Sequence, residues 1–313
     1  MSFAEDVAEG LKAKNKFLPS RYFYDAEGDK LFQQIMKLPE YYLTDSEYEI
    51  FSTRGKDILQ AFSQSSKPFD LLEFGSGDGF KTKILLKRLL DCSAEFTYVP
   101  IDISADVLES LRHELKLEYP SLEVRTKNAE YFKALEEVQI ESDRPKLVLF
   151  IGSSMGNFTE ERIKRFFTEL FNKLKSGDQV LLGYDLKKDP HTILRAYNDE
   201  AGITRAFNLN VLRRINRELD GDFELEAFSH YPFYDPETGL AKSYLISQKQ
   251  QTVRIGKLNQ SFSFERGEAI HTEISRKFTT DQVEDYFAST GFQCVEHFFD
   301  CKHYFVDTLA KKP

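Results

Sequence analysis

A glycine-rich turn at residues 73–79 (EFGSGDG) is the first stretch whose composition points to ligand binding. It follows an apolar run at 68–74 and precedes a helical pattern at 81–90, so it lies where a predicted strand passes into a predicted helix. Small residues there let the backbone approach a ligand that lies across the carboxyl ends of the strands. A glycine turn that binds no ligand is the alternative.

Asp102 is the second residue that points to a nucleoside. It ends the next predicted strand, at residues 96–101, and its carboxylate can accept the hydrogens of both ribose hydroxyls. Alone, Asp102 could equally be a helix cap or a loop acid. Together with the glycine turn, it favours ribose binding.

Two nucleoside cofactors suit such a site. A dinucleotide fingerprint requires a third glycine or an alanine where this chain has Phe80. S-adenosylmethionine (SAM) carries no phosphate and tolerates a bulkier start of the helix, and Glu73 precedes the turn as an acidic residue. We therefore predict SAM rather than a nicotinamide cofactor.

The elements that must position these residues alternate between strands and helices. Such alternation predicts an α/β domain with a parallel sheet covered by helices. A helix at 280–290 followed by runs at 293–299 and 303–309 predicts a terminal antiparallel hairpin. The strands are predicted at residues 68–74, 96–101, 122–126, 146–151 and 179–184, with 122–126 at an edge and the last two central.

The pattern changes after about residue 186. A helical stretch at 190–218 leads to alternating strands at 223–231, 242–254 and 270–278, separated by the turn sequences DPETG and GKLNQS. We therefore predict a discontinuous SAM-binding domain and a second, α+β domain that binds substrate. Their predicted bounds are 46–187 with 278–313 for the first, and 1–45 with 188–277 for the second.

Composition narrows the classes of partner. The chain of 313 residues has 51 acidic and 42 basic side chains, a net charge of −9, which argues against a nucleic-acid partner and favours a small molecule. No stretch has the length of a membrane helix, and the N-terminus lacks a signal peptide, so we expect a cytoplasmic protein. The three cysteines lack metal or redox spacing and are predicted to be buried thiols, and no metal is expected.

Nine motifs stand in order along the chain: LPSRYFYD at 18–25, LPEYY at 38–42, LEFGSG at 72–77, FIGSSMGN at 150–157, LGYDL at 182–186, RAYND at 195–199, AFN at 206–208, INREL at 215–219 and HTEISRKF at 271–278. Together they resemble the histidine Nα-methyltransferase family. The resemblance implies a class I SAM-dependent methyltransferase fold with a Rossmann-like seven-stranded sheet. It also implies that SAM trimethylates the α-amino group of L-histidine to give hercynine, the reaction that leads to ergothioneine. We expect a monomer.

The same resemblance implies the site residues. Glu130 and Tyr131 stand where the family usually has Asp-Phe beside the adenine, and the longer carboxylate can still accept a hydrogen bond from the adenine amino group. The implied cofactor residues are Tyr24, Gly75, Ser76, Gly77, Lys81, Asp102, Glu130, Tyr131 and Gly152. The implied substrate residues are Tyr41, Asn157 and Tyr197 around the α-amino and carboxylate groups, with Tyr41 and Asn157 also catalytic, and Glu273 and Ser275 around the imidazole.

Each substrate residue also has a structural alternative. Glu273 and Ser275 share a strand face that could be solvated, the two tyrosines could be core residues, and Asn157 could be a turn residue. A carboxylate beside a hydroxyl can, however, bind the two different ring nitrogens of imidazole.

Two other functions remain open. Ser243 stands where histidine enzymes can carry a methionine against the substrate ring, which would suit a larger substrate such as a tryptophan derivative. Glu273 argues for histidine, because an indole uses a carboxylate poorly. A SAM-binding protein without catalysis is the third hypothesis.

Overall fold

The computed structural model describes residues 2–62 and 67–313. The chain divides into two compact units: the core unit comprises Leu43–Lys187 and Phe278–Pro313, and the second unit comprises Met1–Tyr42 and Lys188–Lys277. The boundary predicted between residues 45 and 46 lies inside helix α3 (Tyr42–Ala61), because that helix buries its apolar side in the core unit.

One mixed sheet forms the middle of the core unit. Its strands follow the order β12-β13-β6-β5-β1-β2-β3, and β4 also pairs with β2. The pairs from β6 to β3 are parallel, whereas β13 runs antiparallel to both β6 and β12. This confirms the predicted class I methyltransferase sheet and its terminal hairpin. The strands are β1 (Phe69–Phe74), β2 (Phe96–Asp102), β3 (Glu123–Val124), β4 (Lys127–Asn128), β5 (Lys146–Phe150), β6 (Gln179–Asp185), β12 (Gln293–Phe299) and β13 (Phe305–Lys311).

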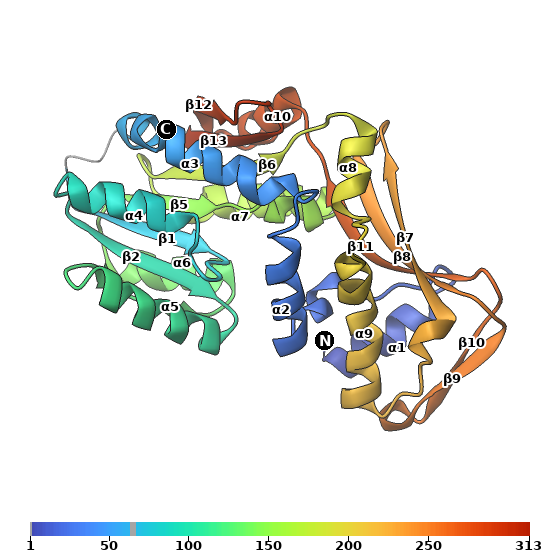
Figure 1. Ribbon diagram of the computed structural model, residues 1–313. Coiled ribbons are helices and arrows are strands. Elements are labelled where there is room, and N and C mark those ends of the chain that lie inside the picture. The colour runs from blue at the N-terminus through green and yellow to red at the C-terminus, as the bar shows by residue number, and fades with distance from the viewer. Residues whose placement is uncertain (1, 63–66) are drawn as a thin grey trace. The chain divides into compact units, whose positions relative to one another are not determined.

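Helices cover both faces of this sheet (Figure 1). Alternation along β1 sends Leu71 into one apolar cluster and Leu72 into the other. The first cluster is completed by α3, α4 and α5, and the second by α6, α7 and α10. These helices are α4 (Thr82–Asp91), α5 (Ala105–Glu118), α6 (Tyr131–Glu141), α7 (Glu160–Lys173) and α10 (Thr280–Thr290).

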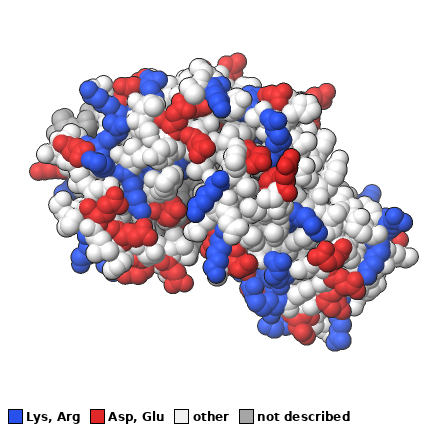
Figure 2. Space-filling model, in the orientation of Figure 1, with Lys and Arg blue, Asp and Glu red and all other residues white. Residues whose placement is uncertain are grey.

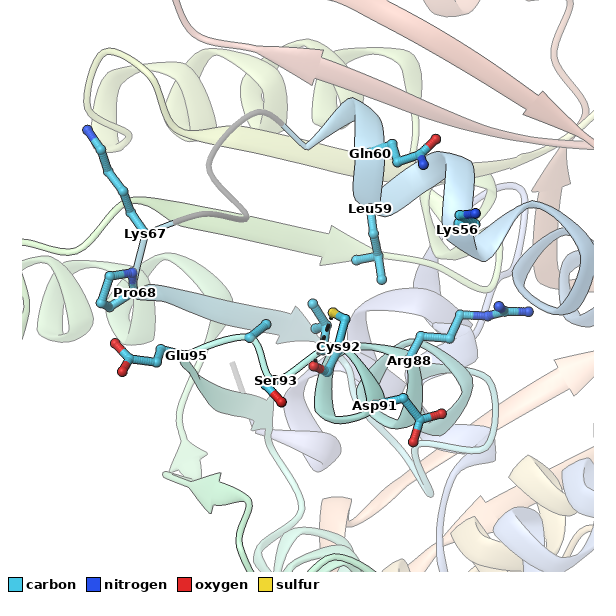
Figure 3. A pocket seen from close by; sticks show the side chains of 12 residues that line it. Lys56, Leu59, Gln60, Lys67, Pro68, Arg88, Asp91, Cys92, Ser93 and Glu95 are labelled. Atoms are coloured by element: carbon cyan, nitrogen blue, oxygen red, sulfur yellow. Dashed lines mark hydrogen bonds between the residues drawn. The ribbon is translucent and has the colours of Figure 1, made fainter.

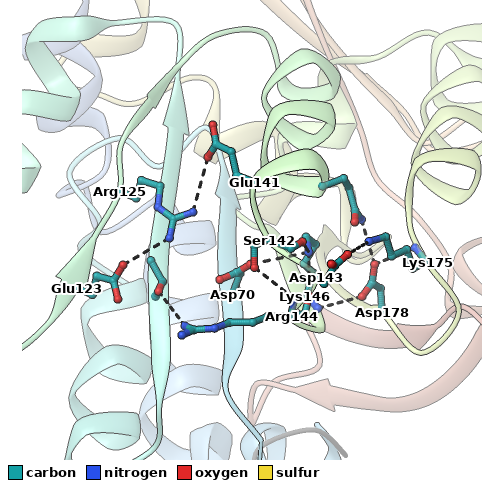
Figure 4. A network of polar contacts seen from close by, with 12 residues as sticks. Asp70, Glu123, Arg125, Glu141, Ser142, Asp143, Arg144, Lys146, Lys175 and Asp178 are labelled. Carbon is teal, nitrogen blue, oxygen red and sulfur yellow. Dashed lines mark hydrogen bonds and ion pairs between the residues drawn. The ribbon is translucent and has the colours of Figure 1, made fainter.

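A buried polar network holds the amino ends of the central strands (Figure 4). The Lys146 ammonium is fully buried, donates to the carbonyl oxygens of Ser142 (2.9 Å) and Arg144 (2.8 Å), and lies 3.8 Å from Asp70. Asp178 accepts the backbone N–H of Lys146 at 2.9 Å. Both Asp70 oxygens lack a hydrogen-bond partner among the described residues, so the charge of Lys146 is what compensates this buried carboxylate.

The second unit packs helices on a small antiparallel sheet. Helix α9 (Ile203–Leu219) shares a core with α1 (Phe3–Lys12), α2 (Ala26–Ile35) and the sheet β11-β8-β7. The sheet strands are β7 (Phe228–Asp235), β8 (Leu240–Ser247) and β11 (Ala269–Arg276), and a separate ribbon joins β9 (Gln251–Ile255) to β10 (Gln260–Phe264). Short helices precede these: η1 (Ser20–Phe23) and α8 (Pro190–Ala196).

Three sequence-based predictions for this unit were wrong in detail. The run at 242–254 is two strands, because the Ser247 hydroxyl donates to the carbonyl oxygen of Lys249 (2.8 Å) and turns the chain between them. The helical stretch at 190–218 breaks before α9, where Asp199 accepts the N–H groups of Ile203 and Thr204. Strand β7 begins only at Phe228, and β10 was not predicted.

The prediction of buried cysteines was also wrong. Cys92, Cys294 and Cys301 are all exposed, because they lie at the end of α4, on the edge strand β12 and in the hairpin turn. Among the described residues, no helix has the length and hydropathy needed to span a membrane. On the face shown in Figure 2, acidic and basic side chains are interspersed, so the net charge of −9 does not collect there into one patch.

The buried ion pair makes a prediction about stability. Lys146→Met leaves Asp70 buried without a compensating charge, so we expect the free energy of unfolding in urea to fall by about 3 kcal/mol or more. Adding Asp70→Asn should restore part of the loss. Lys175→Met, which removes an exposed pair with Asp143, should cost less than about 1 kcal/mol. Equal losses for Lys146→Met and Lys175→Met would contradict this account.

Candidate active site

The glycine turn leaves open space above its backbone. Gly75 and Gly77 have φ angles of +69° and +51°, which side chains other than glycine rarely adopt. No heavy atom lies within 4 Å of the position that a Cβ on Gly77 would take, apart from its chain neighbours. The buried hydroxyl of Ser76 has no hydrogen-bond partner among the described residues. A ligand with polar groups over this turn would satisfy Ser76, so the turn fits the amino-acid end of SAM.

Glu73 supports the turn from inside the unit. Its carboxyl group is buried in β1 and accepts hydrogen bonds from the hydroxyls of Thr82 (2.6 Å) and Tyr98. Burial raises the pKa of Glu73 to about 7, against the effect of these donors. Glu73 therefore ties β1 to α4 and β2 and does not contact the ligand side of the turn.

Asp102 lies beside the glycine turn and is bonded to its backbone. One of its oxygens accepts the N–H of Gly77 (3.3 Å) and the other accepts the N–H of Ser104 (3.0 Å). Ser104, and not Asp102, caps α5, which removes the alternative of a helix cap. Each carboxylate oxygen can accept a second hydrogen bond, so two ribose hydroxyls can still bind.

Tyr131 provides an aromatic wall beside the turn. Its ring stacks on Phe74 with centroids 5.1 Å apart and an interplanar angle of 8°. A Cβ on Gly75 would lie 3.2 Å from the Tyr131 hydroxyl, so the turn and this ring are neighbours. Burial raises the pKa of Tyr131 to about 12, which keeps its phenol neutral. Glu130 is exposed at the start of α6, where it remains accessible to a ligand.

A buried carboxylate that was not predicted from the sequence binds two of the implied cofactor residues. Glu47 of α3 is fully buried, forms an ion pair with Lys81 and accepts the N–H of Gly152 at 2.8 and 3.0 Å. Asp307 lies beside it, and burial and the negative charge of Glu47 raise its pKa well above the usual range. A Cβ on Gly183 would lie 2.3 Å from the Glu47 carboxylate, so a larger residue there would displace the Glu47 side chain.

This pairing changes the expected role of Lys81 and Gly152. The Lys81 ammonium forms an ion pair with Glu47, and the N–H of Gly152 donates to the same carboxylate. Both residues therefore help to fix the loops around the glycine turn, in addition to any contact with a ligand. The signal in the sequence was a glutamate on the otherwise apolar stripe of α3, four residues after Leu43 and four before Phe51.

An aromatic cavity lies in the second unit. Its volume is about 20 Å³, and one implied substrate carboxylate, Glu273, faces it. Tyr41 packs edge-on against Phe32 with centroids 6.3 Å apart. The buried side chain of Thr204 also lines this cavity, and it is a polar group that the sequence analysis missed. The cavity is lined by Phe32, Ile35, Tyr41, Ala196, Tyr197, Thr204, Phe207 and Glu273.

Glu273 is held as a hydrogen-bond acceptor in apolar surroundings. Burial raises its pKa to about 7, while the positive charge of Lys277 and a hydrogen bond from the Ser243 hydroxyl lower it. Ser243 is opposite Glu273 in the pairing of β8 with β11 and is itself buried. The alternative of a solvated strand face is therefore wrong, because Ser275 and Lys277 on the same face are also buried.

The remaining implied residues lie in different surroundings. Tyr197 is buried, and its hydroxyl donates to Ser275 at 2.7 Å. Tyr24 is 41% exposed and packs edge-on against Phe32 and Phe207 of the second unit. Asn157 belongs to the core unit, where it is exposed between buried Gly156 and buried Phe158 at the end of a 3-10 helix, Ser154–Asn157.

A wider hollow lies in the core unit near the amino ends of β1 and β2, whereas the glycine turn follows the carboxyl end of β1 (Figure 3). It is lined by the ends of α3 and α4 and by Pro68, before the start of β1, and includes Lys56, Arg88 and Cys92. None of the implied site residues lines it. Its size therefore does not indicate the catalytic site.

Comparison with known proteins identifies one family. A sequence model of the family described as "Histidine-specific methyltransferase, SAM-dependent" matches residues 3–312. The chain is 38% identical to the histidine N-alpha-methyltransferase of Mycolicibacterium smegmatis, over 92% of this chain and 88% of that protein. It is 35% identical to the enzyme of the same name from Mycobacterium tuberculosis, over 100% and 95% of the two chains. It is 28% identical to ergothioneine biosynthesis protein 1 of Neurospora crassa, over 94% of this chain but 33% of that protein.

The geometry around Asp102 predicts its contribution to cofactor binding. Asp102→Ala removes the acceptor for the ribose hydroxyls, so the affinity for S-adenosylhomocysteine, measured by calorimetry, should fall by about 2 kcal/mol or more. Asp106→Ala, at an exposed position in the first turn of α5, is the control and should bind as the unchanged protein does. Unaltered affinity in the Asp102 variant would remove this residue from the site.

Proposed function

Because the chain belongs to the family of histidine-specific, SAM-dependent methyltransferases, we propose that it transfers methyl groups from SAM to the α-amino nitrogen of L-histidine. The observation that supports this substrate most is the pair on β11, where the half-buried carboxylate of Glu273 and the buried hydroxyl of Ser275 share one face. An imidazole ring can use both, since it has one N–H donor and one bare nitrogen.

The core unit has the groups that SAM requires. Gly75 and Gly77 with the unpartnered Ser76 hydroxyl would hold its amino-acid end, Asp102 its ribose, and Glu130 and Tyr131 its adenine. Lys81 and Gly152 would complete the site while they remain bonded to Glu47. SAM supplies an electrophilic methyl group on a sulfonium, and no metal or acid is needed to activate it.

The second unit has the groups that recognise the amino acid. Glu273 and Ser275 would bind the imidazole, and Tyr41 and Tyr197 would contact the amino and carboxylate groups. A contact of Asn157 with the same groups is a prediction of the family resemblance alone. Tyr24 would contribute at the cofactor's amino-acid end. Aromatic walls fit a substrate whose nitrogen becomes a quaternary cation, because ring faces attract such a cation by about 0.5 to 2 kcal/mol after its N–H donors are lost.

The reaction is an in-line displacement at the methyl carbon. The attacking nitrogen needs a free lone pair, so its proton must leave before each transfer. Correct orientation of the amine supplies most of the acceleration. Asn157 and Tyr41 are neutral at pH 7 and can orient the amine without stabilising its protonated form. Three rounds would give the trimethylated betaine, hercynine, a precursor of ergothioneine.

A tryptophan derivative is the second candidate substrate, and the environment of Ser243 bears on it. A small residue here could enlarge the ring pocket. The Ser243 hydroxyl instead lowers the pKa of Glu273, which favours its charged, hydrogen-bond-accepting form, while Ser275 needs a ligand atom that an indole does not have. These contacts favour histidine.

The first test is turnover. Purified protein with SAM and L-histidine should give mono-, di- and trimethylated histidine by mass spectrometry, with methylation on the α-nitrogen. Tryptophan, phenylalanine and N-acetylhistidine should give no product, the last because its nitrogen has no usable lone pair. Product from tryptophan derivatives and none from histidine would replace histidine by the second candidate.

The second test concerns Glu273. Glu273→Ala removes a charged acceptor from the imidazole N–H, so histidine affinity should fall by about 2 kcal/mol or more while S-adenosylhomocysteine binds as before. The pKa of about 7 adds a dependence on pH, because protonation of Glu273 below pH 7 removes the acceptor. Affinity for histidine should therefore decline as the pH falls from 8 to 6, and less steeply in Glu273→Gln. Parallel pH profiles would show that Glu273 does not titrate in the site.

A further inference from the structure

Lys277 is a buried cation that none of the implied roles uses. It directly follows β11, and its side chain is fully buried. Its ammonium donates to the Tyr197 hydroxyl oxygen at 2.7 Å and to the Ser275 hydroxyl oxygen at 2.8 Å, and it lies 4.7 Å from the centre of the Tyr197 ring. Burial of an ammonium is costly unless it is compensated, and the two hydroxyl oxygens supply part of that compensation.

Hydrogen-bond accounting at Ser275 shows what Lys277 does. An ammonium has donors and no acceptor, so both of its bonds have a fixed direction. The Tyr197 hydroxyl also donates to Ser275, at 2.7 Å. The Ser275 oxygen therefore accepts two hydrogen bonds, which use both of its lone pairs. Its own hydrogen is not donated to any group among the described residues, and it is the only hydrogen-bonding capacity that Ser275 has left for a ligand.

Glu273 lies two residues before Ser275 on the same face of β11 and can act as a hydrogen-bond acceptor for a ligand. Its carboxylate accepts a hydrogen bond from Ser243, its cross-strand neighbour, and faces the aromatic cavity. The strand thus presents one acceptor, Glu273, and one donor, Ser275. A ring that binds both must have one N–H and one bare nitrogen.

We propose that Lys277 is a positioning residue that makes Ser275 an obligate donor, so that the site selects a neutral imidazole with its N–H toward Glu273 and its bare nitrogen toward Ser275. This proposal rests on the proposed function, since it takes histidine as the substrate. Imidazolium has two N–H groups and no bare nitrogen, so it leaves the Ser275 hydrogen without an acceptor. An indole has the same defect, and Lys277 therefore also sets the choice of substrate.

Three variants of Lys277 and Ser275 separate this role from a merely structural one. Lys277→Met keeps the length of the stem but frees Ser275 to rotate, so the Kd for L-histidine should rise by about tenfold or more, with the Kd for S-adenosylhomocysteine unchanged. Lys277→Gln retains N–H donors without the charge and should recover much of that loss. In a Ser275→Ala background, Lys277→Met should cost little more, because Lys277 acts through Ser275.

Lys242→Met is the matched control. Lys242 is a half-buried lysine of β8 opposite Ile274, on the other face of the same sheet, and its loss should leave histidine affinity unchanged. The melting temperature of each variant shows whether it folds. If Lys277→Met does not fold, Lys277→Leu, which also removes the N–H donors, takes its place in the comparison with Lys277→Gln and Ser275→Ala.

The binding of histidine analogues is a further test, because a merely structural role of Lys277 would not change how strongly the site discriminates between them and histidine. The two pyrrolylalanines, with the ring attached at position 2 or 3, each keep one N–H and replace the other ring nitrogen by C–H. The unchanged protein should bind both at least about tenfold more weakly than histidine, and Ser275→Ala and Lys277→Met should discriminate less. Equal discrimination in Lys277→Met, or losses that add in the double variant, would overturn the proposal. No binding of histidine by the unchanged protein would instead refute the proposed function.

Discussion

A carboxylate removed from water among apolar side chains must be compensated by donors or cations, and the functional parts of both units depend on two buried glutamates and a half-buried one. Glu73 is compensated by two hydroxyls and fixes the strand that carries the glycine turn. Glu47 is compensated by Lys81 and the Gly152 N–H and fixes the loops that follow β1 and β5. Glu273 is compensated by Ser243 and the charge of Lys277, and it faces the aromatic cavity.

This difference distinguishes the two glutamates that stabilise the fold, Glu73 and Glu47, from Glu273, which can bind a ligand. The acceptors of Glu73 and Glu47 are used within the protein, whereas Glu273 retains capacity for a ligand. Its pKa of about 7 reflects incomplete compensation, which a donor on the substrate would correct. The apolar walls raise the strength of that interaction, because a hydrogen bond to a charged acceptor gains most where water is absent.

Much of the core unit could be predicted from sequence, because its signals are local. The apolar run of β1, the glycines after it and the cap at Ser104 each specify their own conformation. The second unit was less predictable. The ends of its strands depend on single side chains such as Ser247. The alternation of polar and apolar residues along 242–254 continues through the turn that separates β8 from β9, so the sequence pattern does not reveal that turn.

The site was predictable as a set of residue types, but not as a network. The sequence and its family resemblance identified Glu273 and Ser275, whereas the roles of Glu47, Ser243 and Lys277 depend on partners far away in the chain. Charged residues on apolar stripes are the one local signal for such groups. The cysteines were mispredicted in the other direction. They were expected to be buried as apolar residues, but all three are exposed, at the end of a helix, on an edge strand and in a turn.

Recognition of one neutral imidazole by an acceptor and a donor is the central claim. Nitrogen NMR of ring-labelled L-histidine, bound with S-adenosylhomocysteine near pH 7, tests it most directly. The account predicts two distinct ring resonances, one with the shift and proton coupling of an N–H and one with the shift of a bare nitrogen. Two protonated nitrogens, or two averaged signals as in free histidine, would contradict it.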